Sequence, residues 1–284
     1  QGIILTRRPF SSGAAYRSIW NKEKDESPLL TNVRQQAEKL KESFAKSFGE
    51  NVIVEFCMRY GNPSTIKTVH EMKEKGCDKI IFLPLYPQYS APTTGTANDE
   101  VFRALMKLKW QPSIMTIPPY FDNSQYISCL ANSVKDRYKE LKNEPEHLVV
   151  SYHGVPERYL LAGDPYHCHC QKTTRLLKEQ LNWDDCSLTT TFQSKFGPGK
   201  WLGPATVDFV SRLANEGKKR IAIIAPAFSS DCIETLEEIK EEIKDSFLVS
   251  GGEEFNYIEC LNSRADHIQF LHDLIVSEAK GWLY

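Results

Sequence analysis

The sequence predicts an α/β protein made of two doubly wound, Rossmann-like lobes with parallel sheets and a cleft between them. Two observations support this fold class. Short β-branched runs alternate with helix-length segments along the whole chain, which is typical of parallel sheets covered by helices on both faces. The two halves of the chain also resemble each other, because "IIFLPLYPQYS" and "IAIIAPAFSSD" each run from a strand through a proline and an aromatic residue to a serine.

The expected strands are short runs rich in β-branched and aromatic residues and bounded by turn residues. They cover 52–58, 79–86, 113–118, 147–152, 187–192, 220–228 and 255–260. The segments between them have the periodicity of amphipathic helices, as in 32–47, where Val33, Ala37, Leu40 and Phe44 share one face. Further helices are expected near 64–75, 97–108, 123–142, 171–181, 205–216, 233–245 and 265–279.

The similarity of the two halves also predicts the domain organisation. Residues 1–118 should form an N-terminal lobe and residues 119–284 a C-terminal lobe, with segment 262–284 packing back on the N-terminal lobe. "VVSYHGVPE" has no counterpart in the first half, so we expect the N-terminal lobe to lack its first βα unit, at least ~30 residues. In such sheets ligands bind beyond the carboxyl ends of the strands, which places the expected site between the lobes.

Composition and charge argue against several classes of protein. Of the 284 residues 41% are hydrophobic, which is enough to bury a sizeable core. The 35 Lys and Arg residues nearly balance 37 Asp and Glu residues, so no bulk attraction to nucleic acid is expected. The longest apolar stretch, 221–228, is too short to span a bilayer. Eight scattered cysteines and no recognisable signal peptide favour the cytoplasm, with peripheral association at the inner membrane left open.

His153 is the first candidate for chemistry. It follows the expected strand 147–152 and precedes a Gly-x-Pro turn, so its side chain should project into the cleft. A lone histidine is more often structural, so the interpretation needs a partner. Glu234 is the best partner, since it lies in the first turn of the helix after strand 220–228. Imidazole and carboxylate together suit either a ferrous ion or proton transfer near neutral pH.

Two further groups of residues extend this site. Glu238 and Glu242 follow Glu234 at intervals of four, so the three carboxylates should lie on one side of a helix. A solvated acidic face is the simpler interpretation, and a path for metal ions is the alternative. Loops at other strand ends carry a cation and large aromatic residues, which suit a flat apolar ligand bearing carboxylates. These residues are Arg59, Tyr60, Tyr86, Tyr89 and Trp201.

Four motifs together resemble ferrochelatase, the family that inserts ferrous iron into a porphyrin. In chain order they are "YPQYSAPTTGT", "SYHGVPERYLLAGDPY", "FQSKFGPGKWLGP" and "SDCIETLEEI". The resemblance covers essentially the whole chain, and its details are similar to the Gram-negative bacterial, protoporphyrin-using branch. It implies two Rossmann-like lobes of the class II chelatase type. It also implies that the family's first strand is absent from this sequence.

The resemblance implies roles for individual residues. His153 matches the active-site histidine of the family and Glu234 its acidic partner, with Glu238 and Glu242 in the acidic ridge that leads from the site. The substrate-pocket positions match Arg59, Tyr86, Ser90, Trp201 and Asp231. Arg7 and Arg8 resemble basic residues at the pocket lip, although the spacing after Pro9 differs. Cys232 stands where some relatives have a second histidine.

The activity implied is insertion of ferrous iron into protoporphyrin IX to form protohaem, the last step of haem biosynthesis. Either His153 or Glu234 can accept the pyrrole protons or ligate the iron, and the sequence leaves this choice open. The alternatives are a chelatase for another tetrapyrrole or metal, such as coproporphyrin or cobalt, and a non-enzymatic tetrapyrrole or iron carrier. The expected partners are the porphyrin and ferrous iron, and both a monomer and a homodimer are compatible with the sequence.

The run His167, Cys168, His169, Cys170 resembles a metal site but lacks the C-x₂₋₄-C spacing of structural zinc. An iron–sulfur cluster is the stronger rival, because some bacterial relatives use internal cysteines. Cys168, Cys170 and Cys186 would then need a fourth ligand. The candidates for it are Cys57, Cys77, Cys129, Cys232 and Cys260. We favour a partly buried loop without a cluster.

Overall fold

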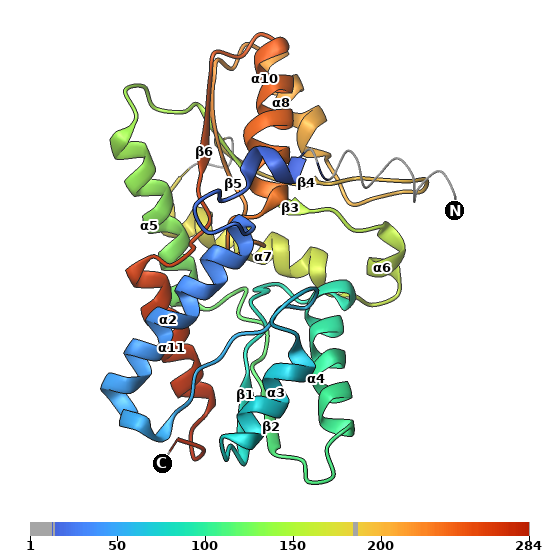
Figure 1. Cartoon of the computed structure of the whole chain (residues 1–284). Helices are drawn as coiled ribbons and strands as arrows, with labels where there is room; N and C mark the ends of the chain where they lie inside the picture. Colours follow the sequence, from blue (N-terminus) through green and yellow to red (C-terminus); the bar gives the residue numbers. More distant parts are fainter. Residues whose placement is uncertain (1–12, 14, 184–186, 284) are drawn as a thin grey trace.

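The computed structural model describes residue 13, residues 15–183 and residues 187–283. The chain folds into two lobes, each built on a parallel sheet and covered by helices (Figure 1). Within the described residues, the upper lobe of Figure 1 has four strands in the order β4-β3-β5-β6, and the lower lobe has the pair β1-β2. The predicted α/β class with parallel sheets is confirmed.

The sheet of the C-terminal lobe is buried on both faces. Its strands are β3 (His147–His153), β4 (Leu188–Gln193), β5 (Arg220–Ile224) and β6 (Glu254–Ile258). Helices α5 (Ser124–Glu140) and α7 (Tyr166–Leu181) cover one face. The other face is covered by α8 (Thr206–Asn215), the π-helical turn η4 (Glu238–Ile243) and α10 (Lys244–Val249). Parallel strands in this setting are mostly apolar, as the runs "LVV" in β3 and "IAII" in β5 are.

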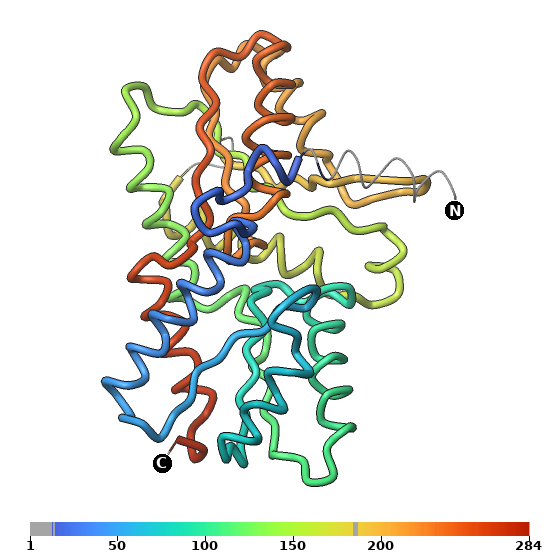
Figure 2. The backbone as a smooth tube through the Cα atoms, in the orientation of Figure 1, coloured from blue at the N-terminus to red at the C-terminus, as the bar shows by residue number. Residues whose placement is uncertain are grey.

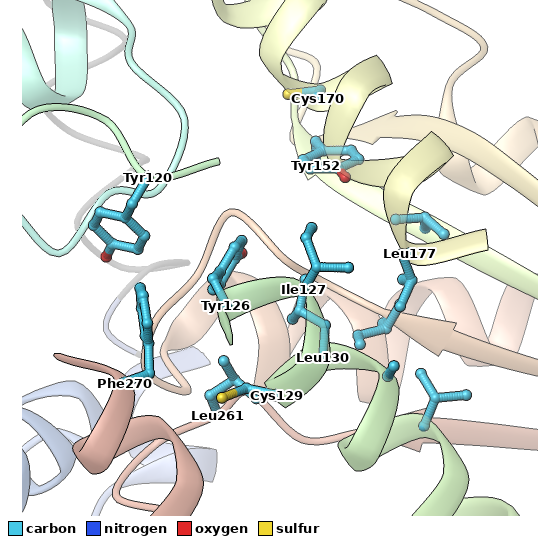
Figure 3. Close-up of a cluster of buried hydrophobic side chains, with 14 of the residues drawn as sticks. Tyr120, Tyr126, Ile127, Cys129, Leu130, Tyr152, Cys170, Leu177, Leu261 and Phe270 are labelled. Atoms are coloured by element: carbon cyan, nitrogen blue, oxygen red, sulfur yellow. The ribbon is translucent and has the colours of Figure 1, made fainter. Parts of the chain in front are cut away.

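The larger core cluster lies between this sheet and the helices α5, α7 and α11 (Ala265–Glu278), and Figure 3 shows part of it. Tyr126 and Phe270 pack in this cluster beside Tyr120. The buried hydroxyl of Tyr126 still needs a partner, and it donates to the carbonyl of Pro226 at 2.6 Å. This bond fixes the loop that follows β5, where the expected site begins.

The sheet of the N-terminal lobe is smaller. Strands β1 (Lys79–Phe82) and β2 (Ser113–Thr116) pair in parallel, with Ile80 opposite Ile114. One face packs on α3 (Thr65–Glu74) and α4 (Thr96–Met106), which follows the π-helical turn η2 (Ala91–Gly95). On the other face Ile81 and Leu83 are only partly buried against the larger core cluster.

Helices from near the two ends of the sequence lie side by side next to this lobe. Helix α2 (Pro28–Phe48) is followed by a short 3₁₀ turn, η1 (Gly49–Asn51), and lies along α11 (Figure 2). Beyond α11 the ammonium of Lys79 lies 6.0 Å from the centre of the Trp282 ring. The C-terminal segment therefore returns to the N-terminal lobe.

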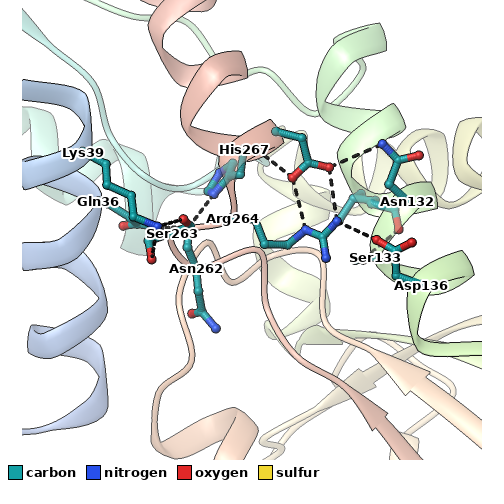
Figure 4. A network of polar contacts seen from close by, with 11 residues as sticks. Gln36, Lys39, Asn132, Ser133, Asp136, Asn262, Ser263, Arg264 and His267 are labelled. Atoms are coloured by element: carbon teal, nitrogen blue, oxygen red, sulfur yellow. Dashed lines mark hydrogen bonds and ion pairs between the residues drawn. The ribbon is translucent and has the colours of Figure 1, made fainter. Parts of the chain in front are cut away.

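A polar network joins the start of α11 to its neighbours (Figure 4). Arg264 pairs with Asp136 of α5 at 3.0 Å, and Gln36 of α2 donates to the carbonyl of Asn262 at 3.0 Å. His267 is buried, and its Nδ1 lies 2.8 Å from the same carbonyl. Because α2 and α5 both bond to this segment, the network ties the start of α11 to both helices.

Several predicted elements need correction. The strand expected at 52–58 is wrong: the segment is extended, but its only ladder contact among the described residues is an isolated bridge between Met58 and Ser64. Periodicity detects an extended segment, whereas a strand also needs a hydrogen-bonding neighbour. Helix α7 begins at Tyr166, five residues before the predicted start at 171, so the His-Cys-His-Cys run is helical rather than a loop.

The helix expected at 233–245 is divided into α9 (Ile233–Leu236), η4 and α10. A short helix, α6 (Glu157–Leu161), was not predicted. None of the helices in the described part of the chain has the length and apolar character needed to cross a membrane.

Candidate active site

A cavity of about 1040 Å³ lies between the two lobes and reaches the ends of β3 and β5. It brings together residues from both halves of the sequence. The N-terminal lobe contributes Arg59, Tyr60 and Tyr86, and the C-terminal lobe contributes His153, Phe228 and Glu234. The same cavity extends between the extended segment 52–58 and β1, where its walls are mostly apolar. Its size is at the upper end of the range for small-molecule sites, which is roughly 300–1,000 Å³.

His153 is the last residue of β3 and lines this cavity. The next residue must be glycine, because a Cβ at Gly154 would lie 2.7 Å from the carbonyl oxygen of Gln193. The Nδ1 atom of His153 lies 2.7 Å from the carbonyl oxygen of Gly154. A carbonyl can only accept a hydrogen bond, so Nδ1 carries a proton. Nε2 is therefore the ring nitrogen of His153 that can take part in proton transfer or metal binding.

Glu234 lies in the first turn of α9 and lines the same cavity. Its backbone carbonyl accepts a hydrogen bond of 2.7 Å from the side-chain amide of Gln193, whose oxygen accepts one of 2.7 Å from Ser151. Gln193 is buried and pairs in register with His153. The sequence analysis did not single it out, although its place at the end of the predicted strand 187–192 was an available signal.

Cys232 lies two residues before Glu234 and is buried. Burial, with the nearby carboxylate of Glu234 as the next cause, raises the pKa of the Cys232 thiol well above its usual value. The side chain is therefore a neutral thiol and not a thiolate. A thiolate is the form of cysteine that binds metal strongly, so burial disfavours the metal-binding form of Cys232.

The N-terminal lobe presents aromatic rings and one cation. The Arg59 guanidinium lies 4.4 Å from the centre of the Tyr60 ring and 3.8 Å from the carboxylate of Glu100. Burial is the main cause that raises the pKa of Tyr86, so this phenol stays neutral. Tyr16, which no motif indicated, also lines the cavity, and its pKa is raised by burial and then by the charge of Glu234.

Three residues carried over from the resemblance are not among the lining residues of the cavity: Ser90, Trp201 and Asp231. Ser90 is fully buried and donates to Asp164 at 2.9 Å. Asp231 accepts hydrogen bonds from Tyr257 and Asn262, each at 2.6 Å. These two side chains therefore lie behind the residues that line the cavity.

Trp201 packs on the turn after His153. Its ring would lie 3.3 Å from a Cβ at Gly154, and its backbone forms a bridge with Pro156. The ring of Trp201 also contacts that of Phe196, at 5.2 Å between ring centres. Trp201 therefore supports the segment that carries His153. Arg7 and Arg8 lie outside the described residues.

The acidic residues of η4 are arranged differently from the expected ridge. The Glu238 carboxylate accepts bonds from the Ser194 backbone at 2.6 Å, the Ser194 hydroxyl at 2.5 Å and the Gln193 amide at 3.1 Å. It therefore fixes the end of β4. Glu242 is exposed, and its N–H bonds to the carbonyl of Glu237 across the wider π turn. Burial and then the neighbouring carboxylates, Glu242 first, raise the pKa of Glu237.

The four residues of the His-Cys-His-Cys run are not gathered at one point. Cys170 is fully buried, Cys168 is exposed, and burial raises the pKa of the Cys170 thiol well above its usual value. The His167 ring stacks near Phe192, with 6.0 Å between centres, whereas His169 stacks on Phe121 at 3.6 Å. Cys186 lies outside the described residues. In the part of the chain that the structure describes, no three His, Cys, Asp or Glu residues are grouped as a metal site.

Comparison with known families agrees with this geometry. The family model for ferrochelatase matches residues 1–279. The chain belongs to the ferrochelatase family. It is 54% identical to a ferrochelatase of Rhodobacter capsulatus over 284 residues, which are all of this chain and 81% of that protein. It is 50% identical to a ferrochelatase of Agrobacterium fabrum over 282 residues, with 99% and 81% of the two chains covered.

Solved structures show the same fold at low sequence identity. SirB from Bacillus subtilis with Fe³⁺ matches with a TM-score of 0.60 and 14% identity, over 88% of this chain and 92% of that one. The cobalt complex of the sirohydrochlorin chelatase SirB, from Bacillus subtilis subspecies spizizenii, matches with a TM-score of 0.57 and 11% identity, over 87% and 91%. The predicted chelatase fold is confirmed. The chain is a metal chelatase of the ferrochelatase family, and a non-enzymatic carrier is not favoured.

Proposed function

We propose that this chain binds protoporphyrin IX in the cavity between its lobes and inserts ferrous iron into it, with His153 and Glu234 at the reacting centre. One observation carries the proposal. His153 at the end of β3 and Glu234 in the first turn of α9 line the same cavity as Arg59 and the rings of Tyr60 and Tyr86. Rings suit the faces of a porphyrin, and the guanidinium suits its carboxylates.

Metal insertion requires that two pyrrole protons leave the porphyrin. His153 is suited to accept the first, because its Nδ1 proton is held by the Gly154 carbonyl and Nε2 is free to bind another proton. The imidazolium that forms keeps the same hydrogen bond, so the ring need not turn. Glu234 then serves as the contact for the incoming iron and as the second acceptor. Aromatic contacts from the N-terminal lobe supply the binding energy that holds the ring against these groups.

Glu237 and Glu242 follow Glu234 along the chain, and Glu242 is exposed. We propose that their carboxylates conduct iron to the site. Carboxylate oxygens bind ferrous iron less strongly than thiolates do, so they pass an ion on without retaining it. Glu238 contributes charge to this path, but its oxygens already accept three hydrogen bonds from Gln193 and Ser194. With Glu234 as the one protein contact at the centre, coordination positions remain for the porphyrin nitrogens.

We propose no iron–sulfur cluster, because Cys168 and Cys170 differ so completely in exposure. Protein purified without oxygen should be colourless and should lack visible thiolate-to-iron absorption bands. A brown protein that loses its colour in Cys168→Ser or Cys170→Ser would contradict this expectation. We also place the enzyme in the cytoplasm, since the free thiols of the described cysteines suit a reducing compartment.

The test is a metal-insertion assay with two porphyrins and three metals. Protoporphyrin and coproporphyrin are each offered ferrous iron, cobalt and zinc, and product formation is followed by absorbance. We expect protoporphyrin with ferrous iron to give the highest kcat/KM. A preference for coproporphyrin would contradict the proposed substrate, and binding of porphyrin without any insertion would contradict the proposed roles of His153 and Glu234.

A further inference from the structure

Two side chains near the start of α7 hold the loop that carries Tyr86 toward the cavity. The backbone N–H of Tyr89 donates to Nδ1 of His169 at 3.2 Å. The Ser90 hydroxyl and the Ala91 N–H both donate to Oδ2 of Asp164, at 2.9 and 2.8 Å. The loop belongs to the N-terminal lobe and α7 to the C-terminal lobe (Figure 1), so these bonds cross between the lobes.

His169 is itself fixed in place. Its ring stacks on Phe121 with 3.6 Å between centres and 9° between planes. A further bond to the loop also comes from α7, because the amide of Gln88 donates to the hydroxyl of Thr173 at 3.1 Å. These four hydrogen bonds join residues 88–91 of the loop to one segment, residues 164–173.

The loop connects these contacts to the cavity. Tyr86 and Gln88 both line the cavity, and only Pro87 separates them along the chain. Proline fixes its own φ and so removes one of the backbone rotations that could uncouple Tyr86 from residues 88 and 89. Neither His169 nor Asp164 is among the lining residues of the cavity.

We propose that His169 and Asp164 are positioning residues for porphyrin binding: as hydrogen-bond acceptors at the start of α7, they hold the 86–91 loop so that the Tyr86 ring faces the cavity. This inference rests on the proposed function of the cavity. It assigns the second histidine of the His-Cys-His-Cys run a task that needs no metal. What His169 must supply is an acceptor at the position of Nδ1, and stacking on Phe121 alone does not replace it.

The first experiment measures how well the loop amides are protected from exchange when no porphyrin is present. Amide hydrogen exchange is followed for residues 88–91 in the parent protein and in three variants. His169→Phe keeps a ring to stack on Phe121 and loses the acceptor, so the Tyr89 amide should exchange about fivefold faster or more, as the loss of one hydrogen bond predicts. His169→Asn restores an acceptor near Nδ1 and should return exchange to within about twofold of the parent. His167→Phe is the matched control and should leave these amides unchanged.

A second arm does not depend on the folding of a His169 variant. Asp164→Ala removes the acceptor of the Ala91 N–H, so the Ala91 amide should exchange faster by a similar factor. Unchanged exchange at Tyr89 in His169→Phe, or at Ala91 in Asp164→Ala, would overturn the proposal. Because no porphyrin is present, these outcomes do not depend on whether the proposed function is right.

The second experiment tests whether the position of the loop affects binding of the substrate. His169→Phe should raise KM for protoporphyrin about three- to tenfold and change kcat less than about twofold, with KM restored in His169→Asn. Faster exchange with an unchanged KM would overturn the positioning role, since the loop would then not govern binding. A parent protein that binds no porphyrin at all would instead count against the proposed function, and the exchange data would still stand.

Discussion

The sheets of the two lobes differ in completeness although their strands have similar sequences. In the C-terminal lobe β3 and β5 are flanked on both sides, and Val149, Ile221 and Ile223 are fully buried. In the N-terminal lobe β1 pairs only with β2 among the described residues, and Ile81 and Phe82 stay partly exposed. The cavity separates β1 from the extended segment 52–58.

This difference matches the division of tasks that we propose. His153 ends β3 and Glu234 lies in the first turn of α9, whereas Arg59, Tyr60 and Tyr86 come from the lobe with the smaller sheet. Proton transfer needs fixed geometry, because a general base must reach its proton within hydrogen-bond distance. Contacts to the faces of a large ring tolerate more movement. The comparison therefore predicts that changes at His153 and Glu234 affect the chemical step. Changes at Arg59, Tyr60 and Tyr86, or in the α7 contacts that hold the Tyr86 loop, should affect binding.

The largest expected effect is that of His153→Ala. Removal of a positioned base should lower kcat for iron insertion by about 10² to 10⁴. Porphyrin affinity, measured by fluorescence titration, should change little, because the ring contacts come mostly from the other lobe. Glu234→Gln should behave similarly, since it keeps the shape and loses the charge.

The double variant His167→Ala, His169→Ala provides the comparison for this result. It should lower kcat less than about tenfold, because neither histidine follows a strand into the cavity. All variants are first checked by thermal melting. If the double variant abolished insertion while His153→Ala retained it, the assignment of the site would be wrong.

The next largest effect concerns the free energy of unfolding. An isoleucine is replaced by alanine in one strand of each sheet, and the two losses are compared. Ile223→Ala in β5 should lower the free energy of unfolding by about 3–4 kcal/mol, because it leaves a void in a fully buried core. Ile81→Ala in β1 should cost about 1–2 kcal/mol, since Ile81 already borders the cavity and loses fewer contacts. Urea unfolding measures both. Equal losses would show that the two sheets are equally well packed.

A pH effect is expected where α11 joins the lobes. Burial lowers the pKa of His267 to about 4, below its unfolded value of about 6.5. Between these values the unfolded chain binds a proton that the folded chain does not, so stability falls as pH falls from 6.5 to 4. The loss between pH 7 and pH 5 should be about 1–2 kcal/mol. Urea unfolding of His267→Gln, compared with the parent, should show a correspondingly weaker dependence over this range. An identical slope would contradict a buried neutral imidazole.

The smallest effect tests binding in the N-terminal lobe. Arg59→Gln removes a guanidinium that we assign to a porphyrin carboxylate, so KM for protoporphyrin should rise about tenfold while kcat stays within about twofold. Arg103→Gln is a suitable control, because Arg103 pairs with the same Glu100 from the surface of α4. A fall in kcat at constant KM would place Arg59 in the chemical step and break the division between the lobes.

The sequence predicted the fold where hydrophobic pattern and pairing agree. The run "HLVVSY" became β3, which ends at His153, since a strand buried on both faces has a mostly apolar sequence. The same pattern failed at 52–58, because pairing depends on neighbours that a local pattern does not contain. The start of α7 was missed for a related reason: polar His and Cys residues obscure the periodicity of its first turn.

For the candidate site, the sequence proposed His153 and Glu234 from their places after predicted strands, and the structure puts both on one cavity. Their roles stay a prediction. The equal spacing of Glu234, Glu238 and Glu242 could not show that η4 is a π turn or that Glu238 binds Ser194. Ser90 and Asp231 are polar residues beside the site in sequence, but their partners come from distant segments. Only the folded chain reveals such pairings.

The side chain of Gln193 has a consequence for how this site can change over time. Gln193 lies opposite His153 in the sheet, and its side-chain amide donates to the backbone carbonyl of Glu234. One side chain therefore positions both residues, and the register of β3 and β4 contributes to the spacing between His153 and Glu234. Loops around the cavity can lengthen, shorten or exchange residues, and so adapt to different tetrapyrroles, while this spacing is preserved.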